Sequence, residues 1–296
     1  MRLALFGKKV DRTNIESLML FINKLSEYKH VELCYNANFY NMLLQFEKNI
    51  PQGTFFTDQN DLPKDITLFL SLGGDGTFLE SLTLVQDRQI PIAGINFGRL
   101  GFLTTACVSE ENTWIDSLLN GDYSVEDRTL ITLEGAGAEE NLYPYALNEI
   151  TIQRSAPSML EIDVAINGQK LPKYCADGIV IATATGSTAY SLSIGAPVVM
   201  PGSSVLIIAP IAPHNLNVRP LIVPDDSVIE ISYTGRTPGA ILTLDNRYID
   251  VESGKKIKIM KKFFVSLVML LSLSAVAFAV DVTVDSYTYT TDENGI

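Results

Sequence analysis

Cysteine, histidine and tryptophan are scarce in this sequence of 296 residues, which contains three cysteines, two histidines and one tryptophan. The odd number and wide spacing of Cys34, Cys107 and Cys175 argue against a disulfide framework. With only His30 and His214 beside them, the chain offers no cluster of the nitrogen and sulfur ligands that zinc prefers. These absences predict a reduced, cytoplasmic protein without a zinc site.

Positive charge is also in short supply. Lysine and arginine number 22 against 34 aspartates and glutamates, which gives a net charge of −12 at pH 7. Nucleic-acid binding depends on cationic contacts to phosphate, so we expect no nucleic-acid partner. A phosphorylated ligand would have to be held locally, by backbone N–H groups, a few basic side chains or a metal ion. Hydrophobic residues make up 47% of the chain, enough for one large domain or two ordinary ones.

Residues 260–296 have the layout of a secretory signal peptide, at the wrong end of a chain. Met260-Lys-Lys-Phe-Phe is followed by an apolar run to Val276 and by the small-x-small segment Ala277-Phe-Ala. We expect this tail to lie outside the fold and to derive from a second reading frame, joined by gene fusion or an assembly error. The alternative is a C-terminal helix packed on the first domain. Contact with a membrane depends on the segment 260–280 being a genuine part of the protein.

The first 122 residues alternate between strand-like and helix-like stretches, which favours a parallel sheet with helices on its faces. Apolar residues recur at helical spacing in the segment 14–27. The expected strands are Arg2–Phe6, Ile66–Ser71 and Ile90–Ile95, and the expected helices are Asn14–Glu27, Asn38–Glu47, Thr77–Val85 and Trp114–Leu119. We predict an α/β domain over residues 1–122.

From residue 123 to 259 the pattern changes to short strands separated by Gly, Pro, Asn and Asp. The expected strands are Arg128–Leu133, Leu147–Gln153, Leu160–Ile166, Gly178–Ala182, Ser204–Ala209, Ser227–Ser232 and Ala240–Leu244. Asn167-Gly168 predicts a tight hairpin turn before Gln169–Leu171. This pattern predicts a second domain, mostly antiparallel β, packed closely against the first.

The segment Gly73-Gly-Asp-Gly-Thr77 follows an expected buried strand and opens a helix. Ligands bind at such positions in open α/β sheets, beyond the carboxyl ends of the strands. Glycines let the backbone approach phosphate oxygens, and the start of the helix adds unpaired N–H groups. A carboxylate repels phosphate, so Asp75 fits better as a group that orients or deprotonates an attacking hydroxyl, or that holds a metal ion. An ordinary strand–helix turn is the alternative.

A second segment, Asp177 to Ser193, is rich in hydroxyl groups. Thr185, Ser187, Thr188, Ser191 and Ser193 surround Gly186, and Tyr190 adds an aromatic ring. This chemistry suits a nucleoside, because hydroxyls can bond ring nitrogens and ribose while an aromatic ring lies against the base. Taken alone, the segment would be interpreted first as a helix start capped by Ser and Thr.

Together these motifs resemble the NAD kinase family over roughly residues 1–259. Gly73–Thr77 alone is shared with 6-phosphofructokinases and diacylglycerol-type lipid kinases, but Asp177–Ser193 is similar to the family pattern DGxxxSTPTGSTAYSLS almost residue for residue. Further matches are Gly94–Leu103, Asn148-Glu149, Ala212–Pro220 and Leu244-Asp-Asn-Arg247, where the family often has LDGQ. There are departures as well, since Ala182 and Ala184 replace a serine and a proline.

The resemblance implies an α/β N-terminal domain, a β-rich, β-sandwich-like C-terminal domain, and a homo-oligomer. It also implies phosphoryl transfer from ATP, or polyphosphate, to the adenosine 2′-hydroxyl of NAD, with Mg²⁺ as cofactor. Asp75 would be the catalytic residue, and the turn around it would meet the donor phosphates. The residues implied in binding are Gly73, Gly74, Asp75, Gly76, Thr77, Phe102, Asn148, Glu149, Asp177, Thr185, Thr188, Ala189, Tyr190, Ser191, Leu192 and Ser193.

Two alternatives stay open at this point. Another kinase with the GGDG turn, acting on a lipid or a sugar, would need no nucleoside pocket. A catalytically inactive dinucleotide-binding protein would keep that pocket without turnover, and the retention of Asp75 argues against it.

Overall fold

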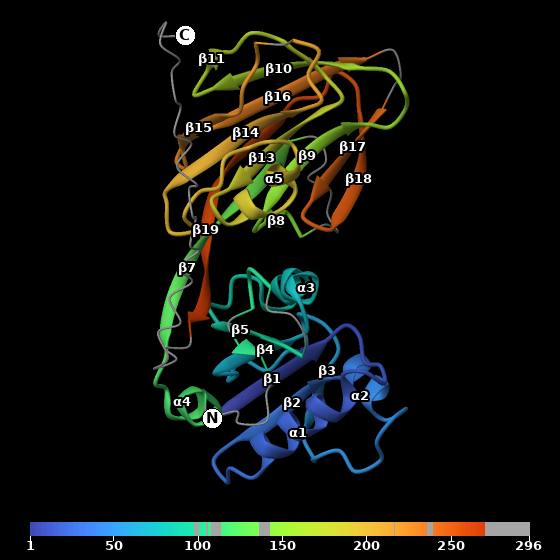
Figure 1. Ribbon diagram of the computed structural model, residues 1–296, viewed down its shortest axis with the longest axis vertical. Helices are drawn as coiled ribbons and strands as arrows, with labels where there is room; N and C mark the ends of the chain where they lie inside the picture. The colour runs from blue at the N-terminus through green and yellow to red at the C-terminus, as the bar shows by residue number, and fades with distance from the viewer. Residues whose placement is uncertain are drawn as a thin grey trace, which may run out of the picture.

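The computed structural model describes residues 1–97, 101–104, 106–107, 114–135, 143–215, 217–235 and 239–269, with the backbone alone for residues 107 and 263–269. Its N-terminal half is a parallel sheet flanked by helices, as predicted (Figure 1). The strands are β1 (Arg2–Gly7), β2 (Glu32–Asn36), β3 (Thr54–Phe56), β4 (Leu68–Leu72), β5 (Ile92–Asn96) and β6 (Ala106–Cys107), and the helices are α1 (Ile15–Ser26), α2 (Ala37–Leu43), α3 (Asp75–Val85) and α4 (Trp114–Asn120). Helix α2 is shorter than expected: after Leu43 the chain continues in turns, with the amides of Gln45 and Phe46 donating to the carbonyls three residues earlier.

Alternate side chains of β1 enter two different cores, which places helices on both faces of the sheet. Leu3 and Leu5 pack in a cluster with residues of α1 and α4, whereas Ala4 and Phe6 pack with residues of α3. The sheet therefore presents the carboxyl ends of β1, β4 and β5 at one edge, where α3 begins.

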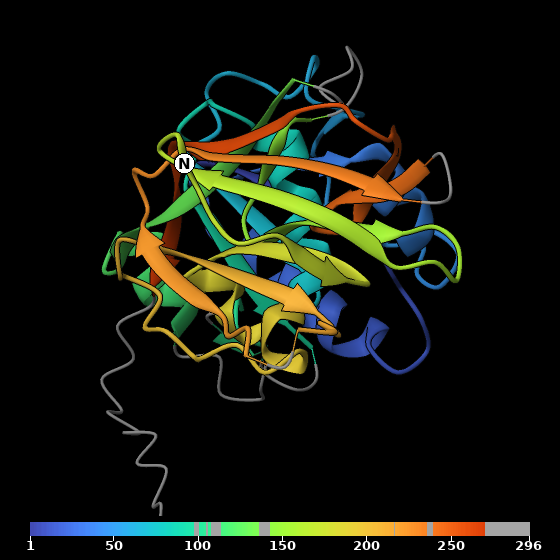
Figure 2. The same ribbon diagram turned by 90° about the horizontal axis from the view of Figure 1, so that it is seen from above.

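The C-terminal half contains two antiparallel sheets facing each other. Its elements are β7 (Ser124–Gly135), β8 (Tyr145–Ala146), β9 (Glu149–Arg154), β10 (Leu160–Ile166), β11 (Gln169–Lys170), β12 (Tyr174–Ala176), β13 (Gly178–Thr183), the 3₁₀ helix η1 (Thr185–Thr188), α5 (Tyr190–Ser193), β14 (Val205–Ile211), β15 (Leu221–Pro224), β16 (Ile229–Gly235), β17 (Gly239–Leu244), β18 (Arg247–Glu252) and β19 (Ile257–Met269). One sheet has the order β15-β14-β13-β9-β17-β18, and the other includes β11-β10-β16-β19 with β7 beside β19. Figure 2 looks onto this half from above, with β10 beside β16 and β14 beside β15.

One buried cluster fills the space between these sheets. It combines Ile150, Ile179 and Leu242 of the first sheet with Ile162 and Ile231 of the second. The shared core is that of a β-sandwich. The expected hairpin turn is also confirmed, because Asn167 and Gly168 have φ of 50° and 81° between the paired Ile166 and Gln169.

Strands β7 and β19 run side by side from the C-terminal half to the N-terminal half (Figure 1). At its far end β19 joins the parallel sheet, where Leu267 pairs with Ile92 of β5. The strand β19 therefore belongs to both halves.

This strand crosses the residue at which we expected the fold to end. The ladder with β7 continues from Met260, opposite Thr132, to Met269, opposite Ser124. The expected boundary before Met260 therefore needs correction for residues 260–269, because a short apolar run fits a buried strand as well as the centre of a signal peptide. Residues 270–296 lie outside the described residues, so their origin stays a prediction. Within the described part of the chain, no helix is long and apolar enough to span a membrane.

Truncation provides a check on the role of β19. We expect a chain ending at Ile259 to be less stable than a chain ending at Met269 by at least about 3 kcal/mol, since it loses several ladder hydrogen bonds that each contribute roughly 0.5–1.5 kcal/mol. Urea unfolding of the two chains measures this difference. Equal stabilities would show that residues 260–269 do not belong to the folded unit.

Candidate active site

The glycine turn between β4 and α3 has a backbone that only glycine adopts easily. Gly73 has φ of 151°, and a Cβ on it would lie 2.5 Å from Oγ1 of Thr77. Its amide donates to the carbonyl of Ile95 at 2.8 Å, which ties the turn to the end of β5. Gly74 caps the helix, and Gly76 is exposed in the first turn. The amides of Asp75 and Gly76 have no partner within α3, because the first N–H groups of a helix lie outside its ladder of hydrogen bonds, which makes them candidate donors at the carboxyl edge of the sheet.

Asp75, the first residue of α3, is held in place by the loop that follows β5. Its carboxylate accepts the backbone amides of Phe102 and Leu103, both at 3.0 Å. Gly101 lies against the same carboxylate, where any Cβ would overlap Oδ1. These contacts fix the orientation of Asp75, and they leave the ring of Phe102 73% exposed beside it.

The segment from Leu147 to Glu149 enters the site from the C-terminal half. The amides of Leu147, Asn148 and Glu149 donate to the carboxylate of Asp245 at 2.9, 2.8 and 3.1 Å. Asp245 sits in the turn between β17 and β18 with φ of 52°, and its own amide donates to the Glu149 carbonyl. The predicted strand Leu147–Gln153 consequently begins only at Glu149, because its first residues bend to meet Asp245.

Glu149 carries a buried oxygen without a partner. Within the part of the chain that the structure describes, its Oε2 accepts no hydrogen bond, although the residue is only 8% exposed. Burial, together with the nearby charge of Asp245, raises the pKa of Glu149 to about 8, and the backbone amide of Tyr190 partly opposes this. A buried acceptor of this kind is costly unless a ligand supplies the missing donor.

The hydroxyl-rich segment packs directly on Asn148. A Cβ on Gly186 would overlap the Asn148 carbonyl, and Oγ1 of Thr183 donates to the Leu147 carbonyl at 2.5 Å. Ser191 is buried and donates to the Gly186 carbonyl at 2.8 Å. Among the described residues, the hydroxyl of Thr188 donates one long hydrogen bond, 3.4 Å, to the Thr185 carbonyl.

The remaining predicted residues of this segment lie further out. Thr188, Ala189 and Tyr190 are partly exposed, whereas Leu192 and Ser193 face solvent. The amide of Tyr190, which faces Glu149, joins α5 to the Asn148–Glu149 segment.

The glycine turn with Asp75 and the Asn148–Glu149 segment come from different halves of the molecule and lie on facing elements. In Figure 1, α3 lies at the end of the N-terminal half that faces β8 and α5. Leu147, with partly buried Tyr143 and Tyr145, belongs to the same buried cluster as Phe78 and Leu79 of α3. The structure thus brings Asp75 and the Asn148–Glu149 segment onto adjoining elements.

Asp177 is the predicted residue that lies apart. It precedes β13, whereas the hydroxyl-rich segment follows that strand, and the strand's six residues span about 20 Å. Its carboxylate forms an ion pair of 2.9 Å with Arg154. Asp177 therefore stands at the opposite end of β13 from Thr185 and Thr188.

Two polar residues outside the predicted site adjoin it. Asp245 binds the three amides described above, and the sequence indicated it only through the match of Leu244–Arg247 to LDGQ. Lys8 follows Gly7, which pairs with Leu72 just before the glycine turn, and its ammonium lies 2.6 Å from Glu80 of α3. In the sequence, Lys8 and Lys9 directly follow the strand β1, and this position could have predicted a positive charge at this edge of the sheet.

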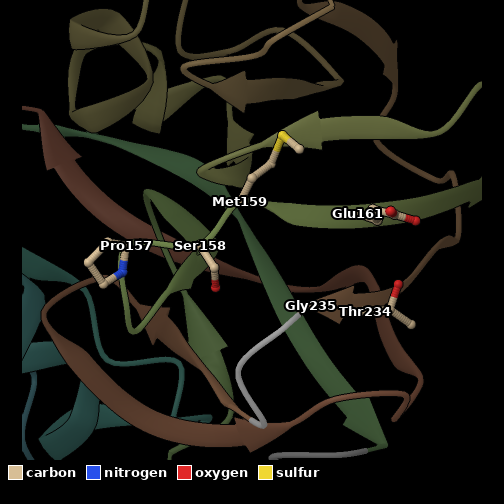
Figure 3. Close-up of a pocket in the computed structure, with 6 residues that line it drawn as sticks. All are labelled: Pro157, Ser158, Met159, Glu161, Thr234 and Gly235. Atoms are coloured by element: carbon tan, nitrogen blue, oxygen red, sulfur yellow. The ribbon is translucent and has the colours of Figure 1, made fainter.

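A cavity of about 420 Å³ lies elsewhere, between the loop before β10 and the end of β16 (Figure 3). It is lined by Pro157, Ser158, Met159, Glu161, Thr234 and Gly235, none of which belongs to the predicted site. Among the described residues, no group of three or more His, Cys, Asp or Glu side chains could hold a metal ion.

Comparison with known proteins agrees with this geometry. The ATP-NAD kinase N-terminal domain matches residues 45–123, and the ATP-NAD kinase C-terminal domain matches residues 147–264. The NAD kinase of Flavobacterium psychrophilum is 37% identical over 270 residues, covering 89% of this chain and 90% of that protein. The NAD kinase of Cytophaga hutchinsonii is 40% identical over 269 residues, covering 88% and 89%.

Solved structures show the same likeness. A yeast NADH kinase complexed with NADH superimposes with a TM-score of 0.78 at 26% identity, over 90% of this chain and 82% of that one. An NAD kinase from Archaeoglobus fulgidus in complex with ATP gives a TM-score of 0.68 at 25% identity, over 90% and 93%. With two domain matches and relatives of this similarity over most of its length, the chain belongs to the NAD kinase family.

Proposed function

We propose that this protein transfers the terminal phosphoryl group of ATP to the 2′-hydroxyl of the adenosine ribose of NAD, forming NADP. The observation that carries this proposal is the buried Oε2 of Glu149, which has no partner among the described residues and lies beside Asn148 and the hydroxyl-rich segment. A ribose diol is a double donor of hydrogen bonds, and it would satisfy the Glu149 oxygen that the protein leaves without a partner.

Asp75 is the proposed general base. A base must point at the proton it accepts, and the amides of Phe102 and Leu103 hold the Asp75 carboxylate in one orientation. The exposed ring of Phe102 offers an apolar face for adenine next to that carboxylate. Asp75 would thus orient the ribose hydroxyl and accept its proton as the phosphoryl group is transferred.

The donor phosphates are proposed to lie on the glycine turn from Gly73 to Thr77. Outward-facing amides at the start of α3 suit phosphate oxygens, and the adjacent Lys8 adds a positive charge. Mg²⁺ bound to ATP would neutralise the charge that develops during transfer. The protein's own contribution is positioning, through the oriented carboxylate of Asp75 and the amides of the turn.

We further propose that NAD extends along the Asn148–Glu149 segment and the residues Thr185 and Thr188–Ser193. Asp177, at the other end of β13, would meet the dinucleotide only at its nucleoside farther from Asp75. In that case Asp177 would either leave its ion pair with Arg154 or bind the ligand and Arg154 at the same time.

The assembly and location are also proposals. Homo-oligomer formation is supported by apolar side chains exposed on and near the edge strand β15, with Val198 64%, Met200 77% and Ile222 52% exposed. A cytoplasmic location is supported by the supply of NAD and ATP there and by the free thiols of Cys34 and Cys175.

Purified protein with ATP, Mg²⁺ and NAD tests the function directly. We expect NADP to form, measured with an NADP-specific dehydrogenase. Diacylglycerol and simple sugars should not be phosphorylated, because neither carries an adenine to lie against the exposed ring of Phe102 or a dinucleotide to extend along the hydroxyl-rich segment. Phosphorylation of a lipid or a sugar at a comparable rate would favour a different GGDG kinase, and binding of NAD without any turnover would favour an inactive dinucleotide-binding protein.

Replacing Thr188 by valine tests the hydroxyl-rich segment. Valine keeps the shape and removes a hydroxyl that makes only one weak contact within the protein. We expect NAD affinity to fall by roughly 0.5–1.5 kcal/mol, the usual contribution of one hydrogen bond, with unchanged stability. Isothermal titration with NAD measures the loss. Thr83→Val on α3, which also removes a hydroxyl bonded to its own helix, is the matched control and should bind NAD normally.

A further inference from the structure

Arg247, the first residue of β18, reaches back to the segment that leads into the site. Its guanidinium donates to the backbone carbonyls of Tyr143 and Tyr145, the latter at 2.5 Å. It also stands over the ring of Tyr143, 5.2 Å from the centroid. The side chain is only 19% exposed, and it lies 3.8 Å from the carboxylate of Asp245. A single arginine thus joins the β17–β18 turn to the chain just before Asn148.

The segment that Arg247 holds is the link between the two halves of the site. Tyr143, Tyr145 and Leu147 pack in the cluster that contains Phe78 and Leu79 of α3. Helix α3 begins with Asp75, whereas the residues after Leu147 are Asn148 and Glu149. A shift of this segment would therefore change the position of Glu149 relative to Asp75.

Charge is the second part of the arrangement. Asp245 and Glu149 are both buried carboxylates, and Asp245 contributes to the raised pKa of Glu149. Burial raises the pKa of Asp245, while the amides it accepts and the Arg247 guanidinium lower it. The other ionisable groups around this cluster are Tyr143, beside Arg247, and Tyr145 and Asp87, both of which raise the pKa of Tyr143. Arg247 is the cation that faces Asp245.

We propose that Arg247 is a positioning residue for NAD, which locks the Asn148–Glu149 segment against α3 and balances the charge of Asp245. This role rests on the proposed NAD site, but it names a residue that touches neither reactant. The guanidinium is suited to it, because its planar set of donors can bond two carbonyls while keeping its charge when buried. Loss of Arg247 would leave Asp245 with the amides alone and release the carbonyls of Tyr143 and Tyr145.

Three substitutions in the full-length chain separate position from charge. Arg247→Met removes both the donors and the charge, Arg247→Gln keeps an amide donor without charge, and Arg247→Lys keeps the charge. NAD dissociation constants are measured from pH 6 to 9.5, with kcat at saturating NAD and a melting temperature for each variant. Lys255→Met, which removes an exposed lysine in the turn before β19, is the matched control.

In wild type, NAD affinity should rise with pH up to about 8, since only ionised Glu149 accepts both ribose hydroxyls. Arg247→Met should weaken NAD binding by at least tenfold and move this midpoint upward by roughly one pH unit, with kcat within about threefold. Arg247→Gln should show the same shift of midpoint with a smaller loss of affinity. Arg247→Lys should keep the wild-type midpoint while both uncharged variants shift it, a contrast that a merely structural role would not produce.

Unchanged affinity and midpoint in Arg247→Met would overturn the proposal. So would a loss of affinity that is equal at every pH and as large in Arg247→Lys as in Arg247→Met, because that pattern reflects packing alone. If Arg247→Met does not fold, the midpoints of the glutamine and lysine variants decide. Wild-type protein that forms no NADP contradicts the proposed function itself, whereas normal NADP formation with indifferent Arg247 variants contradicts only this inference.

Discussion

Replacing Asp75 by asparagine should lower turnover by roughly 10²–10⁴-fold, the usual effect of losing a positioned general base. The affinity for NAD should change by only a few-fold, because Asp75 acts on the hydroxyl proton and other residues hold the dinucleotide. Asparagine keeps one oxygen to accept from Phe102 or Leu103, but its NH₂ group opposes the second amide. Some loss of stability, about 1–3 kcal/mol, is therefore expected as well.

The measurement is kcat at saturating NAD and ATP, together with an NAD titration and a melting curve. Glu16→Gln is the matched control, since Glu16 is likewise the acidic residue in the first turn of a helix, α1, in the same half. It should have wild-type kcat. If a folded Asp75→Asn protein keeps more than about a tenth of the wild-type rate, Asp75 is not the general base.

Replacing Glu149 by glutamine should have opposite effects on stability and on binding. The pKa of this carboxyl rises from 4.5 to about 8 on folding, so its contribution to stability is complete below pH 4.5 and is lost as pH rises to 8. Glutamine stays neutral and has the same shape. Above pH 8 the glutamine variant should therefore be more stable than wild type by roughly 3–5 kcal/mol, at 1.36 kcal/mol for each unit of pKa.

Binding of NAD should become weaker in the same variant. A carboxylate accepts two ribose hydroxyls, and hydrogen bonds to a charged group contribute roughly 1.5–3 kcal/mol, so the dissociation constant should rise about 10–100-fold at pH 8.5. Urea unfolding at pH 5 and pH 9, with and without NAD, gives both quantities. Equal pH dependence of stability in the two proteins would show that Glu149 ionises normally, and equal NAD affinity would remove it from the site.

The sequence predicted the parts of the site that depend on neighbouring residues. A buried strand, two glycines and the start of a helix place Asp75 at the carboxyl edge of a parallel sheet, and the structure has Asp75 there. Asn167-Gly168 needs only its own backbone preferences to form a hairpin turn. The two-half architecture followed from the change in periodicity near residue 123 and from the resemblance to NAD kinases.

Strand β19 shows where such a prediction stops. Its apolar run after Met260 is equally compatible with a signal peptide, a helix and a buried strand. The neighbouring strands decide between these structures, because β19 hydrogen-bonds along β7 and reaches β5 at Leu267. The sequence of the tail itself does not indicate which strands it will pair with.

The groups that position Glu149 and Asn148 could not be predicted from neighbouring residues either. Asp245 binds the amides of Leu147 to Glu149 from about a hundred positions along the chain, and Arg247 reaches Tyr143 and Tyr145 over a similar separation. The sequence by itself determined which side chains could carry the chemistry and on which kind of element they sit. Only the tertiary structure decided which remote carboxylate meets which amides and how deeply Glu149 is buried, since local preferences act over a few residues whereas these contacts form through packing of the whole domain.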